Sequence, residues 1–174
     1  MTEIRVFPDP TSLGAAAAEY LLAMLRTEKN SGRYNIALSG GSTPRLMYDY
    51  LAGHTEAGEL CNERARFFFS DERPVGPDDP QSNYRLASEH LFTPLGISEE
   101  VVHRPRGEAP DLEGEASRYE QEIRQYVPSD DAGVPRFDLI FLGMGADGHT
   151  ASLFPDYPFD TDSDALIVAA YVKT

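Results

Sequence analysis

The sequence predicts an α/β fold with a mostly parallel, open sheet and helices on both faces. Short apolar segments typical of strands alternate along the chain with longer segments whose apolar residues recur at helical spacing. Turns of small and polar residues directly follow several strand segments, as they do where strands lead into helices or ligand loops. The 174 residues, 41% of them apolar, suit one domain over residues 1–174 with a sizeable core.

In the first part of the chain, two strand segments are each followed by a helix. Strands are predicted by alternating or apolar residues, and the helices by start signals, namely Asp9–Ser12 for the first and Pro44 for the second. The predicted strands are residues 3–7 and 34–38, and the predicted helices are residues 9–25 and 44–52.

The second part continues the alternation. Three consecutive phenylalanines predict a buried strand, which leads into an exposed Pro- and Asp-rich loop at residues 71–82. Helical spacing is clearest from Leu112 onward. The predicted strands are residues 66–70, 101–103, 137–142 and 166–172, and the predicted helices are residues 83–91 and 112–127.

The charge balance excludes several classes of partner. The net charge is −14, with 29 acidic and 15 basic residues, so the surface repels nucleic-acid phosphates and anionic lipids. We therefore expect no nucleic acid and no membrane as partners. Separately, a small-molecule ligand and a monomeric protein are expected. Cys61 is the single cysteine and no signal peptide is visible, which favours the cytoplasm.

Ligands of parallel sheets bind at the carboxyl ends of strands, so the turns after Leu38, Ser70 and Leu142 are candidate sites. The first turn combines glycines and hydroxyl residues ahead of a helix start, which predicts a phosphate site. It lacks the lysine of a Walker A loop and the G-x-S-x-G of a nucleophile elbow. The same residues are typical of an ordinary helix start with Thr43 as N-cap and Pro44 at the first position, and both interpretations can hold together.

The second turn carries Asp71, Glu72 and Arg73, whose carboxylates and guanidinium can bind hydroxyls and an anionic group. Asn83 can add an amide contact, or Ser82 or Asn83 can cap the following helix. The alternative is a solvated charged loop.

The third turn, residues 143–155, contains G-x-G-x-x-G but does not suit a dinucleotide. The motif comes late in the chain, and Pro155 ends any following helix after about two turns. His149 lies beside Asp147 here, and an imidazole oriented by a carboxylate can transfer protons near neutral pH.

The alternative is a histidine that only fills a structural hydrogen bond. That interpretation is adopted for the other histidines, His54, His90 and His103. Because the four histidines are scattered and only one cysteine is present, no metal site is expected.

Together, LSGGSTP, SDERPVGPDDPQSNYRLA and LGMGADGHTASLFP resemble the glucosamine-6-phosphate isomerase/6-phosphogluconolactonase family, from Ile4 to Lys173. The resemblance implies a Rossmann-like sugar-phosphate fold and no cofactor. The deaminase/isomerase branch typically has Met-Asp-Glu-Tyr at the second turn and Gly-His-Ile-Ala-Phe-Asn-Glu-Pro at the histidine, unlike this chain. The lactonase branch fits better, which implies hydrolysis of 6-phosphogluconolactone to 6-phosphogluconate in the pentose phosphate pathway.

The resemblance also implies roles for the three turns. His149 would act as general base and then acid, with Asp147 orienting it, while Arg73 or the glycine-turn N–H groups would stabilise an oxyanion. Arg73 is an equally good phosphate ligand. The residues expected to bind substrate or phosphate are Ser39, Gly40, Gly41, Ser42, Thr43, Asp71, Arg73 and Asn83.

Family members continue beyond the segment matching residues 165–173 with an Arg-bearing strand and further helices. We therefore expect a domain truncated at its C-terminus. Two other functions stay open, the deaminase/isomerase activity and a non-enzymatic sugar-phosphate sensor domain. The sensor is disfavoured because no basic DNA-binding helix pair is visible.

Overall fold

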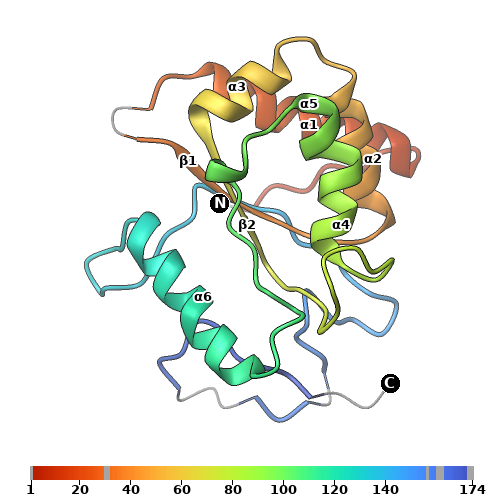
Figure 1. The fold of residues 1–174 in the computed structure, drawn as a ribbon. Coiled ribbons are helices and arrows are strands. Elements are labelled where there is room, and N and C mark those ends of the chain that lie inside the picture. The colour runs from red at the N-terminus through yellow and green to blue at the C-terminus, as the bar shows by residue number, and fades with distance from the viewer. Residues whose placement is uncertain (1, 30–31, 156, 160–162, 172–174) are drawn as a thin grey trace.

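The computed structural model describes residues 2–29, 32–155, 157–159 and 163–171. Its described part contains a parallel sheet of three strands in the order β2–β1–β3. The central strand is β1 (Tyr34–Leu38), between β2 (Ala65–Phe69) and β3 (Leu139–Ile140). Every residue of β1 pairs with β2, from Tyr34 opposite Ala65 to Leu38 opposite Phe69. The predicted α/β fold with a parallel sheet is confirmed (Figure 1).

The helices begin and end close to the predicted positions. The first starts after Asp9 because the Asp9 carboxylate accepts the N–H of Ser12 and Pro10 occupies the first turn. The helices are α1 (Pro10–Arg26), α2 (Ser42–Ala52), α3 (Ala57–Arg64), α4 (Asn83–Ala87), α5 (Thr93–Leu95) and α6 (Leu112–Tyr126). A π-helical turn, η1 (Ser88–Phe92), joins α4 to α5, and a 3₁₀ turn, η2, covers Glu99–Val101. Helix α3 was not predicted, because it buries only Ala57 and Cys61 and lacks an apolar stripe.

Alternating side chains of β2 face two different layers. Phe67 and Phe69 pack into a core formed with α1, α2, α3 and α4, whereas Phe68 packs with Tyr119 and Ile123 of α6. Figure 1 accordingly shows α6 on one side of the sheet and the N-terminal helices on the other. The prediction of helices on both faces is confirmed.

Two predicted strands are wrong. Residues 3–7 form no strand, and Ile4 and Val6 are 86% and 91% exposed. Residues 166–171 also form no strand, while Val172 lies outside the described residues. The N–H of Leu166 donates instead to the Glu120 carboxylate on α6, at 2.9 Å. An apolar pattern alone makes no strand, because a strand exists only where another strand accepts and donates its ladder of hydrogen bonds.

Two other predicted strands are shorter than expected. Within residues 137–142 only Leu139 and Ile140 pair with β1. Within residues 101–103, Val101 ends the 3₁₀ turn and only Val102 forms a bridge, to Phe67. Among the residues described, no helix has both the length and the apolar character that crossing a membrane requires.

Candidate active site

The three turns chosen from the sequence meet in one cleft at the carboxyl ends of the strands. The cleft has a volume of about 250 Å³. Residues 39–44 line it from the end of β1, Asp71 and Arg73 from the end of β2, and Asn83 from the start of α4. The third turn contributes residues 143–145, His149 and Ala151. Every predicted site residue except Asp147 therefore lines this cleft, and the Asp147 carboxylate bonds to the His149 imidazole.

The first turn leads directly into α2 through a glycine. Gly41 is the N-cap, with φ of 105°, a conformation that only glycine adopts without strain. The helix therefore begins at Ser42, and the alternative with Thr43 as N-cap and Pro44 at the first position is wrong. The N–H groups of the first turn of an α-helix have no intrahelical partner. Those of Ser42 and Thr43 lie at the cleft, where they can bind an anion.

The neighbouring glycine allows the second turn to approach. A Cβ atom at Gly40 would lie 1.8 Å from Oδ1 of Asn83, so any other residue would displace this amide. Beneath it, the buried Tyr48 hydroxyl donates to the Ser39 carbonyl at 2.7 Å. Burial raises the pKa of Tyr48, which keeps the phenol protonated as a donor. The backbone of the first turn is thus fixed from inside the core.

Asp71 joins the second turn to both of its neighbours. Its Oδ1 accepts from Asn83 Nδ2 at 3.2 Å, and its Oδ2 accepts from Ser152 Oγ at 2.8 Å. The guanidinium of Arg73 lies 3.9 Å from Oδ2 and is about half exposed, whereas the Asp71 side chain is only 9% exposed. The Arg73 side chain is therefore placed to meet a ligand, and the Asp71 carboxylate holds neighbouring protein groups.

The carboxylate of the adjacent Glu72 is occupied by hydrogen bonds within the protein, which leaves it unsuited to bind a ligand. Its carboxylate accepts from the N–H groups of Asn83 and Tyr84 and from the Ser82 hydroxyl, at 2.8 to 3.0 Å. Ser82 is the N-cap of α4, and its Oγ also accepts from the N–H of Arg85. Of the two carboxylates in this turn, that of Glu72 thus accepts hydrogen bonds from N–H groups at the start of α4. The predicted capping role of Ser82 is confirmed.

The third turn holds His149 and Asp147 as a pair. Nδ1 of His149 lies 2.5 Å from Oδ1 of Asp147, and the His149 N–H also donates to that oxygen, at 3.2 Å. These hydrogen bonds, the backbone one first, lower the pKa of Asp147, so the carboxylate is ionised at neutral pH. A proton on Nδ1 directed at this carboxylate leaves the Nε2 lone pair available.

Glycine is required beside this pair as well. A Cβ atom at Gly145 would lie 2.2 Å from Cε1 of His149 and 2.7 Å from Oδ1 of Asp147. The ring of Phe154 packs on the imidazole, with centroids 4.8 Å apart. The glycine-rich sequence is thus the local reason that histidine and carboxylate can share so tight a turn.

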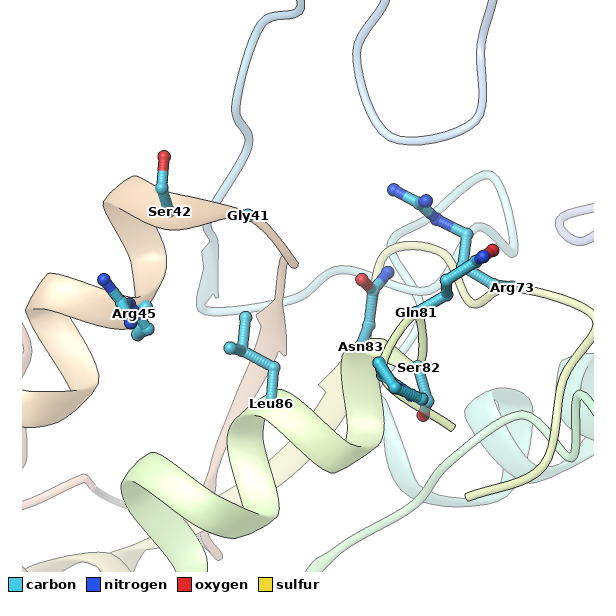
Figure 2. A pocket seen from close by; sticks show the side chains of 9 residues that line it. Gly41, Ser42, Arg45, Arg73, Gln81, Ser82, Asn83 and Leu86 are labelled. Atoms are coloured by element: carbon cyan, nitrogen blue, oxygen red, sulfur yellow. The ribbon is translucent and has the colours of Figure 1, made fainter. Parts of the chain in front are cut away.

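A second hollow of about 340 Å³ continues from the cleft past Gly41, Arg73 and Asn83. Arg45, one turn into α2, lines it across from Arg73, with Leu86 of α4 between them (Figure 2). Arg45 was not among the residues predicted to bind substrate. Arg45 could have been found from its position, because it is a basic residue about one helical turn after the glycines of the predicted phosphate site. At that spacing a side chain lies near the start of the helix.

No group of three or more metal-binding side chains occurs among the residues that the structure describes. The cleft is lined by backbone N–H groups, hydroxyls, an amide, an arginine, one imidazole and the Asp71 carboxylate. Such a set can bind a phosphorylated polyol and transfer a proton to or from it.

Comparisons with known proteins agree with this arrangement. The family model described as glucosamine-6-phosphate isomerases/6-phosphogluconolactonase matches residues 8–173. A Treponema pallidum protein named 6-phosphogluconolactonase is 44% identical over 97% of this chain and 68% of its own length. A Nostoc protein of the same name is 38% identical over 87% of this chain. The solved 6-phosphogluconolactonase of Trypanosoma brucei superposes with a TM-score of 0.81 at 31% identity, over 97% of this chain and 69% of that one.

The chain is shorter than these relatives. It spans 68% of the Treponema pallidum protein and 62% of the Nostoc protein. All three turns lie within the matched residues.

Proposed function

Because the chain belongs to the glucosamine-6-phosphate isomerase/6-phosphogluconolactonase family, we propose that it hydrolyses 6-phosphogluconolactone to 6-phosphogluconate. The observation that carries this proposal is the His149–Asp147 pair, whose imidazole lines the same cleft as Ser42 and Thr43 at the start of α2. One end of the cleft suits a phosphate, and the other provides a base for a water molecule. We also propose that the protein is located in the cytoplasm. Its single cysteine, Cys61, is a free, buried thiol, and burial raises the pKa of this thiol to about 12.

The phosphate end is assigned to the first turn. Backbone N–H groups of Ser42 and Thr43 and the positive end of α2 would bind the phosphate oxygens. Arg45 and Arg73 face the adjoining hollow from opposite sides and would neutralise the remaining charge. This local positive charge is needed because the chain as a whole carries a net charge of −14. Asn83, on the wall between the two hollows, would contact sugar hydroxyls.

The lactone end is assigned to His149. Nε2 would take a proton from a water molecule as its oxygen attacks the lactone carbonyl carbon. The oxyanion that forms would be stabilised by the guanidinium of Arg73 or by N–H groups of the glycine-rich turn. When the bond from the carbonyl carbon to the ring oxygen breaks, the imidazolium would return the proton to that oxygen. Asp147 would keep the imidazole oriented throughout.

The proposal is tested by following freshly generated 6-phosphogluconolactone with and without the chain. The spontaneous hydrolysis of the lactone gives the baseline. We expect a rate proportional to protein concentration, and no conversion of glucosamine 6-phosphate by the same preparation. A protein that is folded by circular dichroism and leaves the spontaneous rate unchanged would exclude the lactonase function. Conversion of glucosamine 6-phosphate instead would assign the chain to the deaminase/isomerase branch.

A further inference from the structure

The turn that carries His149 is attached to the rest of the described molecule at few points. On one side it continues from β3, where the Phe141 N–H donates to the Ala37 carbonyl at 2.9 Å. Beyond that, in the part of the chain that the structure describes, the backbone hydrogen bonds of residues 143–155 stay within the turn, except that the Tyr157 N–H donates to the Phe154 carbonyl at 3.1 Å. Among the described residues, one side-chain hydrogen bond joins this segment to another element, from Ser152 Oγ to Asp71 Oδ2 at 2.8 Å.

The position of Ser152 relative to His149 is fixed by a tight reverse turn. Thr150 and Leu153 pair with each other in both directions, at 2.9 and 3.4 Å, so Ala151 and Ser152 form the tip. Ala151 has φ of 49°, and it is the one non-glycine residue in the described chain with positive φ. Strain of this kind persists only where surrounding contacts hold it. The bond from Ser152 to Asp71 is such a contact.

Asp71 is itself held firmly, which makes it a suitable anchor. Its side chain is 9% exposed, it directly follows Ser70 at the end of β2, and its Oδ1 and its carbonyl both accept from the Asn83 amide. The Ser70 N–H and hydroxyl both donate to the Leu38 carbonyl at the end of β1. The anchor is therefore continuous with the two strands that support the phosphate end of the cleft.

From this geometry we propose that Asp71 and Ser152 are positioning residues that fix His149 relative to the first turn. The inference rests on the proposed function, because it assumes that His149 acts on a substrate whose phosphate lies at α2. It reassigns Asp71, which the sequence suggested as a substrate ligand. The carboxylate binds Ser152 and Asn83, and so links the third turn to the second.

Ser152→Ala tests the proposal because it removes the hydroxyl and little else. A displacement of about 1 Å in a catalytic group can lower turnover by about a hundredfold, so we expect kcat to fall about tenfold to a hundredfold with KM nearly unchanged. Hydrogen exchange of a peptide covering residues 143–155 should become about tenfold faster, since a hydrogen bond to a charged group is lost. Ser152→Thr keeps the hydroxyl and should preserve both kcat and exchange protection.

Ser117→Ala is the matched control, because Ser117 donates only to the Glu113 carbonyl within α6. It should alter neither readout. Ser152→Ala with unchanged kcat, or Ser152→Thr as impaired as Ser152→Ala, would overturn the positioning role. If the unmodified chain shows no lactonase activity, the proposed function fails by itself. The exchange comparison then still decides whether the Ser152 hydroxyl holds the turn.

Discussion

The His149 and His103 regions each contain a histidine bonded through Nδ1 to a carboxylate, as His90 is to Asp49, yet of the first two only the His149 region suits catalysis. His149 pairs with Asp147 at 2.5 Å on the rim of the cleft, and His103 pairs with Glu122 at 2.7 Å against α6. The His149 side chain is 31% exposed and lines the cleft, whereas His103 is 8% exposed and stacks on Phe68.

The second nitrogen separates the two regions. Nε2 of His103 is buried and has no hydrogen-bond partner within the described part of the chain, so no substrate can reach it. Burial lowers the pKa of His103, although Glu122 opposes the shift. A histidine–carboxylate pair is therefore no sign of catalysis by itself. The distinguishing feature is that the His149 side chain lines the cleft, whereas Nε2 of His103 is enclosed.

Exchanging each histidine for alanine should separate the regions most strongly. His149→Ala should lower kcat about 10²- to 10⁴-fold, the usual contribution of a general acid–base, and change the free energy of unfolding by less than about 0.5 kcal/mol. His103→Ala should leave kcat unchanged but lower the free energy of unfolding by about 1–3 kcal/mol, because a buried ring is lost. Lactonase assays and urea unfolding of both variants measure this. Equal losses of activity would show that the distinction is wrong.

The two carboxylate partners allow a finer comparison. Asp147→Asn should lower kcat about tenfold, since the imidazole loses a hydrogen bond to a charged group and this pair is partly exposed. Glu122→Gln should leave kcat unaltered and act on stability, because Glu122 bonds to His103 and Arg118. The kcat values of the two variants, measured side by side, provide the check. A normal kcat for Asp147→Asn would remove the orienting role of the carboxylate.

Arg45 offers a test at the phosphate end of the cleft. Arg45→Ala should raise KM about threefold to tenfold with little change in kcat, because an exposed charge-assisted contact contributes roughly 1 kcal/mol. Arg124→Ala is the matched control on α6, where that guanidinium pairs with Glu120 at 2.9 Å. KM for the lactone is the quantity to compare. Were both variants to raise KM equally, the effect would be one of overall charge.

The parts of the site that the sequence revealed are those with local signals. Gly40 and Gly145 mark close approaches and Gly41 a positive φ, and all three follow strands that place them at one edge of the sheet. His149 and Asp147 are two residues apart, so their contact needs only a tight turn. The Asp71–Ser152 bond joins residues 81 positions apart, and no pattern along the chain marks it.

The fold shows the same division between local and distant causes. The central strand and the long helices follow from apolar spacing and caps, and their positions were predicted closely. Residues 3–7 and 166–171 have strand-like sequences but no paired strand, and pairing depends on distant residues. The N-cap of α2 was predicted at Thr43, but the N-cap is Gly41, whose positive φ ends the turn.

Acidification should expose the smallest difference between the two histidine regions. The lowered pKa of His103 means that the unfolded state binds more protons just below the ordinary value of 6.5, so stability rises with pH in that window. In the folded state His103 stays neutral among Glu122, Arg118 and Arg66, whereas in the unfolded state it takes up a proton. As the pH falls from 7 towards 5, the free energy of unfolding should therefore decrease.

Carboxylates such as Glu122, whose pKa is lowered, contribute their own loss of stability only at more acidic pH. His103→Gln, which cannot titrate, should therefore show a flatter dependence than the unmodified chain between pH 7 and 5. Urea unfolding at pH steps measures the two slopes. Identical slopes would mean that the buried imidazole takes up its proton in the folded state as easily as in water, contrary to its position beneath α6.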